Sequence, residues 1–291
     1  MTNKRAELTY YLMFVPALLL LIGVLIPFVS GVLTSLHSQK LYAQSRDFIF
    51  IDNYIKNFTD PRFLQSAANT FSYVFLVIVI QVPLGIIVAL LLNHRSVFRK
   101  VNRSILVFPL LIPPIVSSLM WKTMMHPSSG VLNYLLSLLG IAPFPWLTGI
   151  NTALLSLVLI DTWIFLPFTT LILLAGLQSL PVDLLEASRI DGASSTQVFR
   201  YIELPWIYPY IILVLLFRVT DSLKSFEIIY STTRGGPLNA TRTMNIMGYE
   251  EAFRWSNLGQ SLSIVFCLWI LAYVASSFLV KRWNTHSQGE S

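Results

Sequence analysis

Six long apolar segments constrain this chain more than any other feature of its sequence. They occupy residues 11–36, 68–92, 104–124, 152–177, 206–223 and 258–280. Each segment is close to, or longer than, the ~20 residues that a helix needs to cross the hydrocarbon core of a bilayer. Only 12% of the 291 residues are charged, against about 25% in ordinary soluble domains. The sequence therefore predicts an all-α integral membrane protein with six transmembrane helices.

The basic residues indicate how these helices are oriented. The loop at 93–103 has basic but no acidic residues, and further basic residues flank both outer segments: Arg95, Arg99, Lys100, Arg103, Lys4, Arg5, Lys281 and Arg282. Short loops rich in Lys and Arg stay in the cytoplasm. We therefore expect cytoplasmic termini, a cytoplasmic loop at 178–205, and one transmembrane domain over residues 1–291 with its core at about 68–280.

Patterns typical of enzymes and metal sites are absent from the sequence. It contains no phosphate-binding loop and no His-Glu-x-x-His pattern, it has a single cysteine, and its four histidines lie in different loops. The formal charge of +6 comes from basic residues at the ends of apolar segments, which membrane topology explains better than nucleic-acid binding. We expect no catalytic residue, no bound metal or cofactor, no nucleic-acid partner, and membrane lipid as the surroundings.

Charged residues inside the apolar segments predict a polar pathway through the membrane. Asp161 lies midway along its segment, and Arg218, Asp221 and Lys224 recur every three residues on one helical face. A charge at this depth costs about 2.5–3.5 kcal/mol unless it faces protein or water. Neighbouring hydroxyl and aromatic side chains suit a polyhydroxy ligand: Ser222, Ser225, Phe165 and Phe168. Alternatively, Arg218, Asp221 and Lys224 form a self-neutralising ladder of ion pairs, and the aromatic residues face lipid or the core.

Prolines interrupt several of the apolar segments. The third segment contains Pro109, Pro113 and Pro114, and each proline removes a backbone donor that membrane interiors replace only with protein or water. Such prolines are found in helices bent around a wet cavity, and also at ordinary kinks.

The loop at 178–205 predicts two short helices along the membrane surface. The first begins near Pro181 and ends at Gly192, a residue free to take positive φ. The second runs from Ser194 or Ser195 to Ile202, and Leu204-Pro205 then breaks the chain before the fifth crossing. The small residues at the turn predict a segment that binds in a groove of another protein.

These residues resemble a known family. Glu186-Ala187-Ser188, Asp191-Gly192-Ala193 and Leu204-Pro205 are similar to the EAA loop of permease subunits of bacterial ABC importers, with Ser188 where the pattern usually has alanine. Gly235-Gly236-Pro237, after the fifth segment, is similar to the maltose "F" type of the carbohydrate-uptake group. The resemblance extends over nearly the whole chain.

The resemblance implies a type I ABC importer permease fold in the bacterial inner membrane. The implied partners are a homologous second permease, two ATPase subunits that hold ATP and Mg, and an extracytoplasmic substrate-binding protein. Coupling to the ATPase would fall on Glu186, Ala187, Ser188, Asp191, Gly192, Ala193, Leu204 and Pro205. The substrate pathway would fall on Asp161, Ile164, Phe165, Phe168, Arg218, Asp221, Ser222 and Ser225.

The implied function is carbohydrate import by alternating access, for a disaccharide, an oligosaccharide or a related polyol. The competing hypothesis is a stand-alone secondary carrier, in which the intramembrane acids relay protons.

Overall fold

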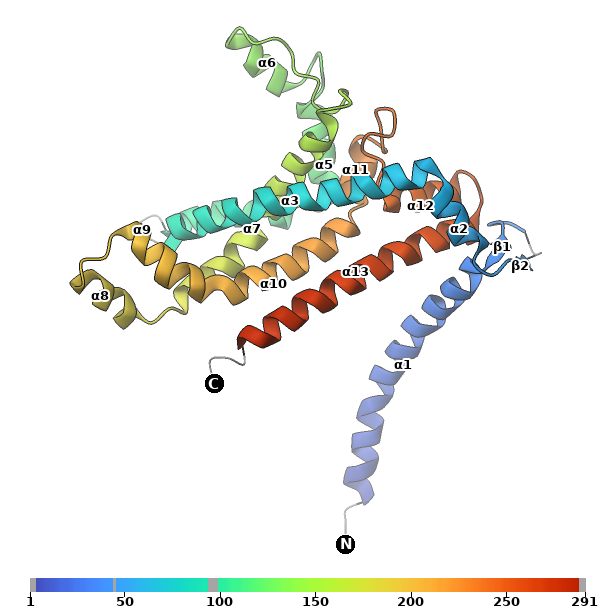
Figure 1. Cartoon of the computed structure of the whole chain (residues 1–291), viewed down its shortest axis with the longest axis horizontal. Helices are drawn as coiled ribbons and strands as arrows, with labels where there is room; N and C mark the ends of the chain where they lie inside the picture. The colour runs from blue at the N-terminus through green and yellow to red at the C-terminus, as the bar shows by residue number, and fades with distance from the viewer. Residues whose placement is uncertain (1–3, 44–45, 94–98, 288–291) are drawn as a thin grey trace. The chain divides into compact units, whose positions relative to one another are not determined.

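Long helices dominate the computed structural model, which describes residues 4–43, 46–93 and 99–287 (Figure 1). Arg95, assigned to the cytoplasmic loop, lies outside these residues. The long helices are α1 (Lys4–Ser35), α3 (Pro61–Asn93), α7 (Ala153–Gln178), α10 (Leu204–Leu223) and α13 (Leu258–Ser287). Among the described residues, five helical stretches are long and apolar enough to cross a membrane.

The third expected crossing is bent. It consists of α4 (Arg99–Val107), the 3₁₀ helix η1 (Phe108–Leu111) and α5 (Pro114–Met124), and its two apolar halves meet at 95°. Ile112 and Pro113 between them are extended, with ψ of 129° and 136°, because prolines cannot continue the backbone ladder. The prolines of this segment predicted a bent or kinked helix, and the structure has a sharp bend at Pro113 and Pro114. Counted as one broken span, this pair raises the possible number of crossings to six.

Shorter elements lie between the long helices. They are the antiparallel strands β1 (His37–Gln39) and β2 (Arg46–Phe48), paired His37 to Phe48, and the helices α2 (Asp52–Thr59), α6 (Val131–Leu138), α8 (Val182–Ile190), α9 (Ser195–Val198), α11 (Glu227–Thr232) and α12 (Met244–Phe253). Of these short helices, α8 and α9 correspond to the two that the loop at 178–205 predicts.

Contacts divide the chain into two compact units. The first unit comprises residues 1–64 and 247–267, and the second comprises residues 65–246 and 268–291. In the first unit, Asn53 Nδ2 on α2 donates to the carbonyls of Ser35 and His37 at 2.8 and 3.0 Å. Asn57 Nδ2 also donates to Ser263 Oγ on α13 at 2.9 Å. Buried amide side chains thus hold the hairpin, α2 and the start of α13 together.

The second unit is built around α7. Two apolar clusters pack against this helix, one containing Tyr73 and Leu157 and the other containing Ala89 and Leu173. Gly176 allows α10 to approach α7 closely, because a Cβ there would lie 2.6 Å from the Tyr210 ring. Close packing of α7 positions the polar site described below.

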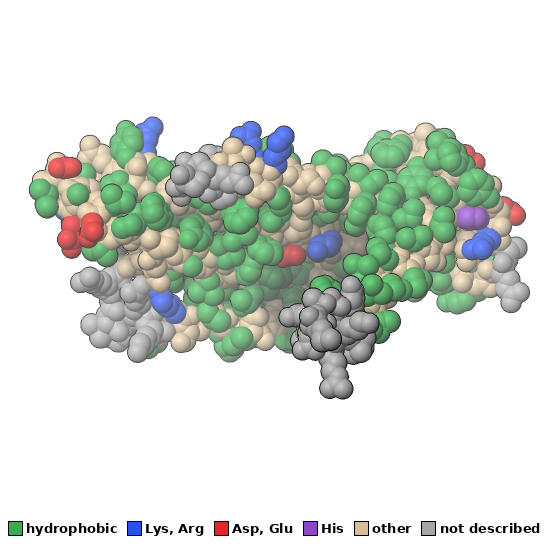
Figure 2. Space-filling model, turned by 90° about the horizontal axis from the view of Figure 1, so that it is seen from below, with side chains coloured by type: hydrophobic (Ala, Val, Ile, Leu, Met, Phe, Trp, Pro, Cys, Tyr) green, Lys and Arg blue, Asp and Glu red, His purple; other side chains and the backbone are tan. Residues whose placement is uncertain are grey.

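Outward-facing apolar side chains are abundant, as expected for a protein surrounded by lipid. Hydrophobic residues cover much of the face in Figure 2. Leu20 on α1 and Leu91 on α3 are 73% and 67% exposed. Apolar exposure of this extent would promote aggregation in water, whereas a bilayer covers it.

Candidate functional site

A buried ion pair lies at the centre of the second unit. Arg218 Nη2 on α10 donates to Asp161 Oδ1 on α7, and each residue is only 1% exposed. The alternative of an ion-pair ladder along α10 does not hold for Arg218, because its guanidinium pairs with Asp161 on another helix. A buried charge is costly without a close opposite charge, and Asp161 provides one where Asp221, at the helix surface, does not.

Two further side chains complete this polar site. Gln81 on α3 bridges the pair, since its Nε2 donates to Asp161 Oδ1 at 2.6 Å and its Oε1 accepts from Arg218 Nε at 2.8 Å. Tyr73 on α3 donates its hydroxyl to Asp161 Oδ2 at 2.7 Å. Gln81 and Tyr73 are both fully buried. Three helices distant in sequence are thus joined through one carboxylate.

The guanidinium of Arg218 keeps one free donor in this site. Among the described residues, its Nη1 is buried without a hydrogen-bond partner. The ring of Phe165 lies 4.4 Å from its Cζ, a distance that allows a cation–π interaction. The arrangement offers a buried N–H beside an aromatic face.

The other predicted pathway residues lie at different depths. Ser222 Oγ is 3.4 Å from Arg218 Nη2, and Ser225 Oγ is 3.4 Å from the Tyr73 hydroxyl. Ile164 is buried in the apolar core, while Phe168 is half-buried and packs edge-on against Phe217 at 5.6 Å. Asp221 is separate from the buried site: it is exposed, and its contact with Lys224 is 3.9 Å long.

Sequence reasoning found Asp161 and Arg218 but not how they pair. A glutamine inside an apolar run was a usable signal for Gln81. Tyr73 gave no such signal, because tyrosine is common in membrane helices and its hydroxyl points to a partner 88 residues away.

The segment from α8 to α10 has the helix–turn–helix form that the sequence predicts. Gly192 has φ of +72°, and it follows α8 in a Schellman motif. In this motif Gly192 N–H donates to the Arg189 carbonyl at 3.1 Å, and Ala193 N–H donates to the Ser188 carbonyl at 3.0 Å. The turn is thus fixed by its own backbone bonds.

The surface of α8 has both charged and apolar side chains without cover from this chain. Glu186, Ala187 and Asp191 are exposed, and Val182 and Ile190 are 57% and 86% exposed. Ser188 instead faces inward, and its Oγ donates to the Leu185 carbonyl at 2.8 Å. A serine in place of alanine is therefore accommodated inside the segment.

The chain is continuous from α9 into α10, so the predicted break at Leu204-Pro205 is wrong. Ser194 and Gln197 form a capping box at the start of α9. A π-helical turn, η2 (Phe199–Glu203), then leads into α10, with Leu204 N–H donating to the Phe199 carbonyl. Because Pro205 follows this wider turn directly, at the first positions of α10, its missing donor does not stop the helix.

No group of three or more His, Cys, Asp or Glu residues within the described ranges is arranged to hold a metal.

Comparisons with known proteins add an independent observation. Residues 81–286 match the family described as "Binding-protein-dependent transport system inner membrane component". A trehalose/maltose transport system permease protein of Thermococcus litoralis is 36% identical over an alignment of 294 positions, which covers 97% of this chain and 98% of that protein. A multiple sugar-binding transport system permease protein of Streptococcus mutans is 29% identical over 275 residues, 92% of each chain.

The fold is also found in solved structures. A chain of a bacterial ABC transporter involved in the import of the acidic polysaccharide alginate superposes with a TM-score of 0.85 at 22% identity, covering 97% of this chain and 96% of that one. At this level of identity the likeness shows a shared fold.

Proposed function

Because this chain belongs to the family of binding-protein-dependent transport system inner membrane components, we propose that it translocates a sugar as the permease subunit of an ATP-driven importer. Family membership confirms the resemblance drawn from the EAA-like segment, the type I importer permease fold and the inner-membrane location.

The observation that carries the proposal is the exposed segment from α8 to α10. Its turn is held by a Schellman motif, and α8 presents exposed apolar and acidic side chains. A rigid surface of this kind suits a groove on a partner ATPase. In this proposal Glu186, Ala187, Asp191, Gly192 and Ala193 form the coupling contact, and Ser188 supports it from the buried side of α8. Leu204 and Pro205 direct the exit of the segment into α10.

The polar site of the second unit supports passage of a polyhydroxy substrate. Asp161, Gln81 and Arg218 offer both acceptors and donors, and Arg218 Nη1 forms no hydrogen bond with any residue that the structure describes. Sugar hydroxyls donate and accept, so they can exchange with these partners. We assign the substrate pathway to Asp161, Ile164, Phe165, Phe168, Arg218, Asp221, Ser222 and Ser225. The two relatives named for trehalose, maltose and multiple sugars favour a neutral di- or oligosaccharide.

The transport cycle in this proposal is alternating access. Two ATPase subunits bind ATP with Mg and close, which draws together the coupling segments of this chain and a homologous second permease. The helices rotate, and the cavity opens outward to accept sugar from the extracytoplasmic binding protein. Hydrolysis returns it to the inward state. ATP drives the change because it binds the closed state more tightly than the open one.

Uptake by proteoliposomes tests the proposal against a proton-coupled carrier. Vesicles with the assembled importer and its binding protein should accumulate labelled maltose or trehalose with internal ATP and be insensitive to a protonophore. Vesicles with this chain alone should accumulate neither sugar. Uptake by the chain alone that followed a proton gradient would refute the importer mechanism.

A further inference from the structure

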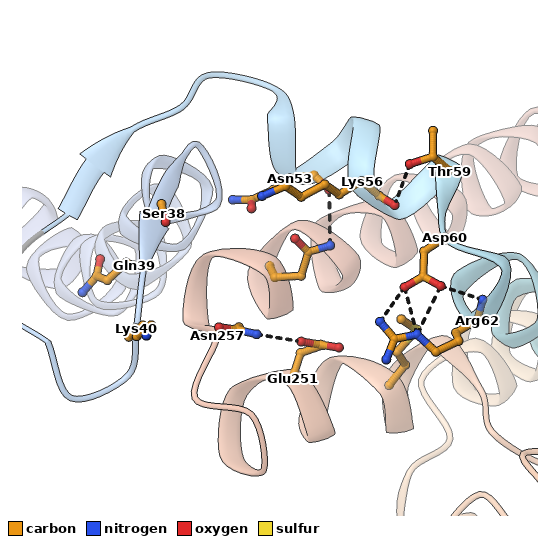
Figure 3. A pocket seen from close by; sticks show the side chains of 12 residues that line it. Ser38, Gln39, Lys40, Asn53, Lys56, Thr59, Asp60, Arg62, Glu251 and Asn257 are labelled. Carbon is orange, nitrogen blue, oxygen red and sulfur yellow. Dashed lines mark hydrogen bonds and ion pairs between the residues drawn. The ribbon is translucent and has the colours of Figure 1, made fainter.

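The first unit contains a polar cavity of about 420 Å³ (Figure 3). One wall is β1 and the residue after it, another is α2 with the start of α3, and a third is the end of α12 with the start of α13. These segments follow the first crossing and precede the last, so with the cytoplasmic termini that the sequence predicts they lie on the extracytoplasmic side. Its volume lies within the range of about 300–1,000 Å³ typical of small-molecule sites.

Hydrogen bonds between neighbouring segments hold the walls of the cavity in place. Asn53 is held by the backbone carbonyls described above, and Gln260 Nε2 donates to Asn57 Oδ1. Lys40 forms an isolated antiparallel bridge with Asn257. A Cβ on Gly259 would collide with the His37 carbonyl. The cavity is thus preformed rather than a gap between mobile loops.

Two acceptors inside the cavity have few or no donors within the described part of the chain. Within the described part of the chain, Gln39 Oε1 is buried with no hydrogen-bond partner. Glu251 is 5% exposed, and its carboxylate accepts one long hydrogen bond, from Asn257 Nδ2 at 3.3 Å. A buried acceptor without a donor costs free energy, so a ligand that supplies O–H or N–H groups here is favoured.

Two of the three basic side chains in the cavity lining have no acidic partner among the described residues. Arg62 is engaged by Asp60 through bonds of 2.7–3.2 Å, as the dashed lines in Figure 3 show. Lys40 and Lys56 are exposed, and neither forms an ion pair with any residue that the structure describes. The rim therefore offers ammonium groups while the interior offers oxygen acceptors.

The positions of these charged and polar groups indicate which kind of ligand fits the cavity. A bare anion would face Glu251, and a bare cation would face Lys40 and Lys56. An apolar ligand would find Met247 as the sole hydrophobic side chain in the lining. Hydroxyl groups can donate to Glu251 and Gln39 while accepting from the lysines.

We propose that this cavity is a second sugar site, an outer subsite that binds a neutral disaccharide on the extracytoplasmic face of the permease. The proposal rests on the proposed function for the kind of sugar. It adds a binding step that is separate from the pathway through Asp161 and Arg218 and that uses residues of the first unit alone.

Saturation-transfer NMR on the full chain in lipid nanodiscs, without ATPase or binding protein, tests the subsite. Maltose and trehalose are the probes, and succinate is the anionic comparison. We expect one of the two sugars to bind. Lys56→Met and Glu251→Gln should each raise its dissociation constant about tenfold or more, as expected for losing a hydrogen bond to a charged group. Asp52→Asn, on the same helix but outside the cavity, should leave it unchanged.

Three outcomes would overturn the subsite: no binding of either sugar, sugar binding that both cavity variants leave intact, or binding of succinate alone. Failure here is distinguishable from failure of the proposed function. ATP-dependent uptake by the assembled importer, with no sugar binding to the isolated chain, would overturn the subsite and leave the importer mechanism standing.

Discussion

At the scale of single residues, removing one partner of the Asp161–Arg218 ion pair should cost more stability than replacing both partners. Replacing a buried ion pair as a whole can be neutral, whereas removing one partner leaves an uncompensated charge. Here Gln81 and Tyr73 also hydrogen-bond to Asp161, so a lone carboxylate would keep neutral partners but lose its opposite charge.

We predict that Arg218→Met lowers the free energy of unfolding by about 3–5 kcal/mol, because it strands the buried Asp161 carboxylate. Adding Asp161→Leu should recover part of that loss, because it removes the stranded charge but leaves the buried Gln81 and Tyr73 without this partner. Thermal unfolding in detergent, followed by tryptophan fluorescence, measures both effects.

The matched control is Lys224→Met, at a side chain that is 64% exposed. This change should shift stability by no more than about 0.5 kcal/mol, as is usual for surface substitutions. Equal losses in Arg218→Met and Lys224→Met, or no recovery in the double variant, would show that the pair is not what stabilises the site.

At the scale of elements, the turns after α8 and α6 share one backbone conformation, but only the turn after α8 has a proposed coupling role. Gly192 ends α8 with φ of +72°, and Gly140 follows α6 with φ of +71°; an added Cβ would meet no atom within 4 Å at either position. A side chain should therefore strain both turns equally, by about 1–2 kcal/mol, without a steric clash.

We predict that Gly192→Asp leaves the protein inserted in the membrane but abolishes most sugar uptake and ATPase co-purification, because a charge and a Cβ disturb the coupling contact. Gly140→Asp carries the same strain and charge, so it should keep both activities. Pull-down of the ATPase together with vesicle uptake measures the difference. Normal uptake by Gly192→Asp, or an equal loss in Gly140→Asp, would count against the coupling role.

Element boundaries were predictable where a local signal sets them. Gly192 after an amphipathic stretch located the end of α8, and the apolar run at 152–177 located α7. Proline was ambiguous. Pro113 and Pro114 lie at a 95° bend, whereas the helix continues through Pro205. The π-helical turn before Pro205 makes this possible, and no residue type in the sequence indicates such a turn.

At the scale of the whole molecule, sequence predicted the membrane-crossing helices but not the division into two units. Apolar length is a local property, so it can be read directly from the residues. The first unit instead depends on polar contacts between distant segments, such as Asn57 with Ser263, 206 residues apart. The candidate site was predictable to the same extent. The cost of burying a charge identified Asp161 and Arg218, but the sequence did not show that they pair through Gln81.

We predict that Gly259→Ala destabilises the first unit by about 1–3 kcal/mol, the usual cost of overpacking a filled site, because its Cβ would collide with the His37 carbonyl. Gly23→Ala on α1 is the control, since a Cβ there meets no atom within 4 Å. Hydrogen exchange over α2 and the hairpin measures the effect. Unchanged protection in Gly259→Ala would mean that the hairpin is not fixed against α13.

Helix α1 has a consequence for the thickness of the surrounding bilayer. Its apolar stretch Phe14–Ser35 has 22 residues, and only 6% of its most apolar window is buried within the chain. At 1.5 Å per residue it is about 33 Å long, close to a hydrocarbon core of about 30 Å. Because so little of it packs against the chain itself, its tilt is free to adjust: a thicker bilayer would hold it upright, and a thinner one would incline it.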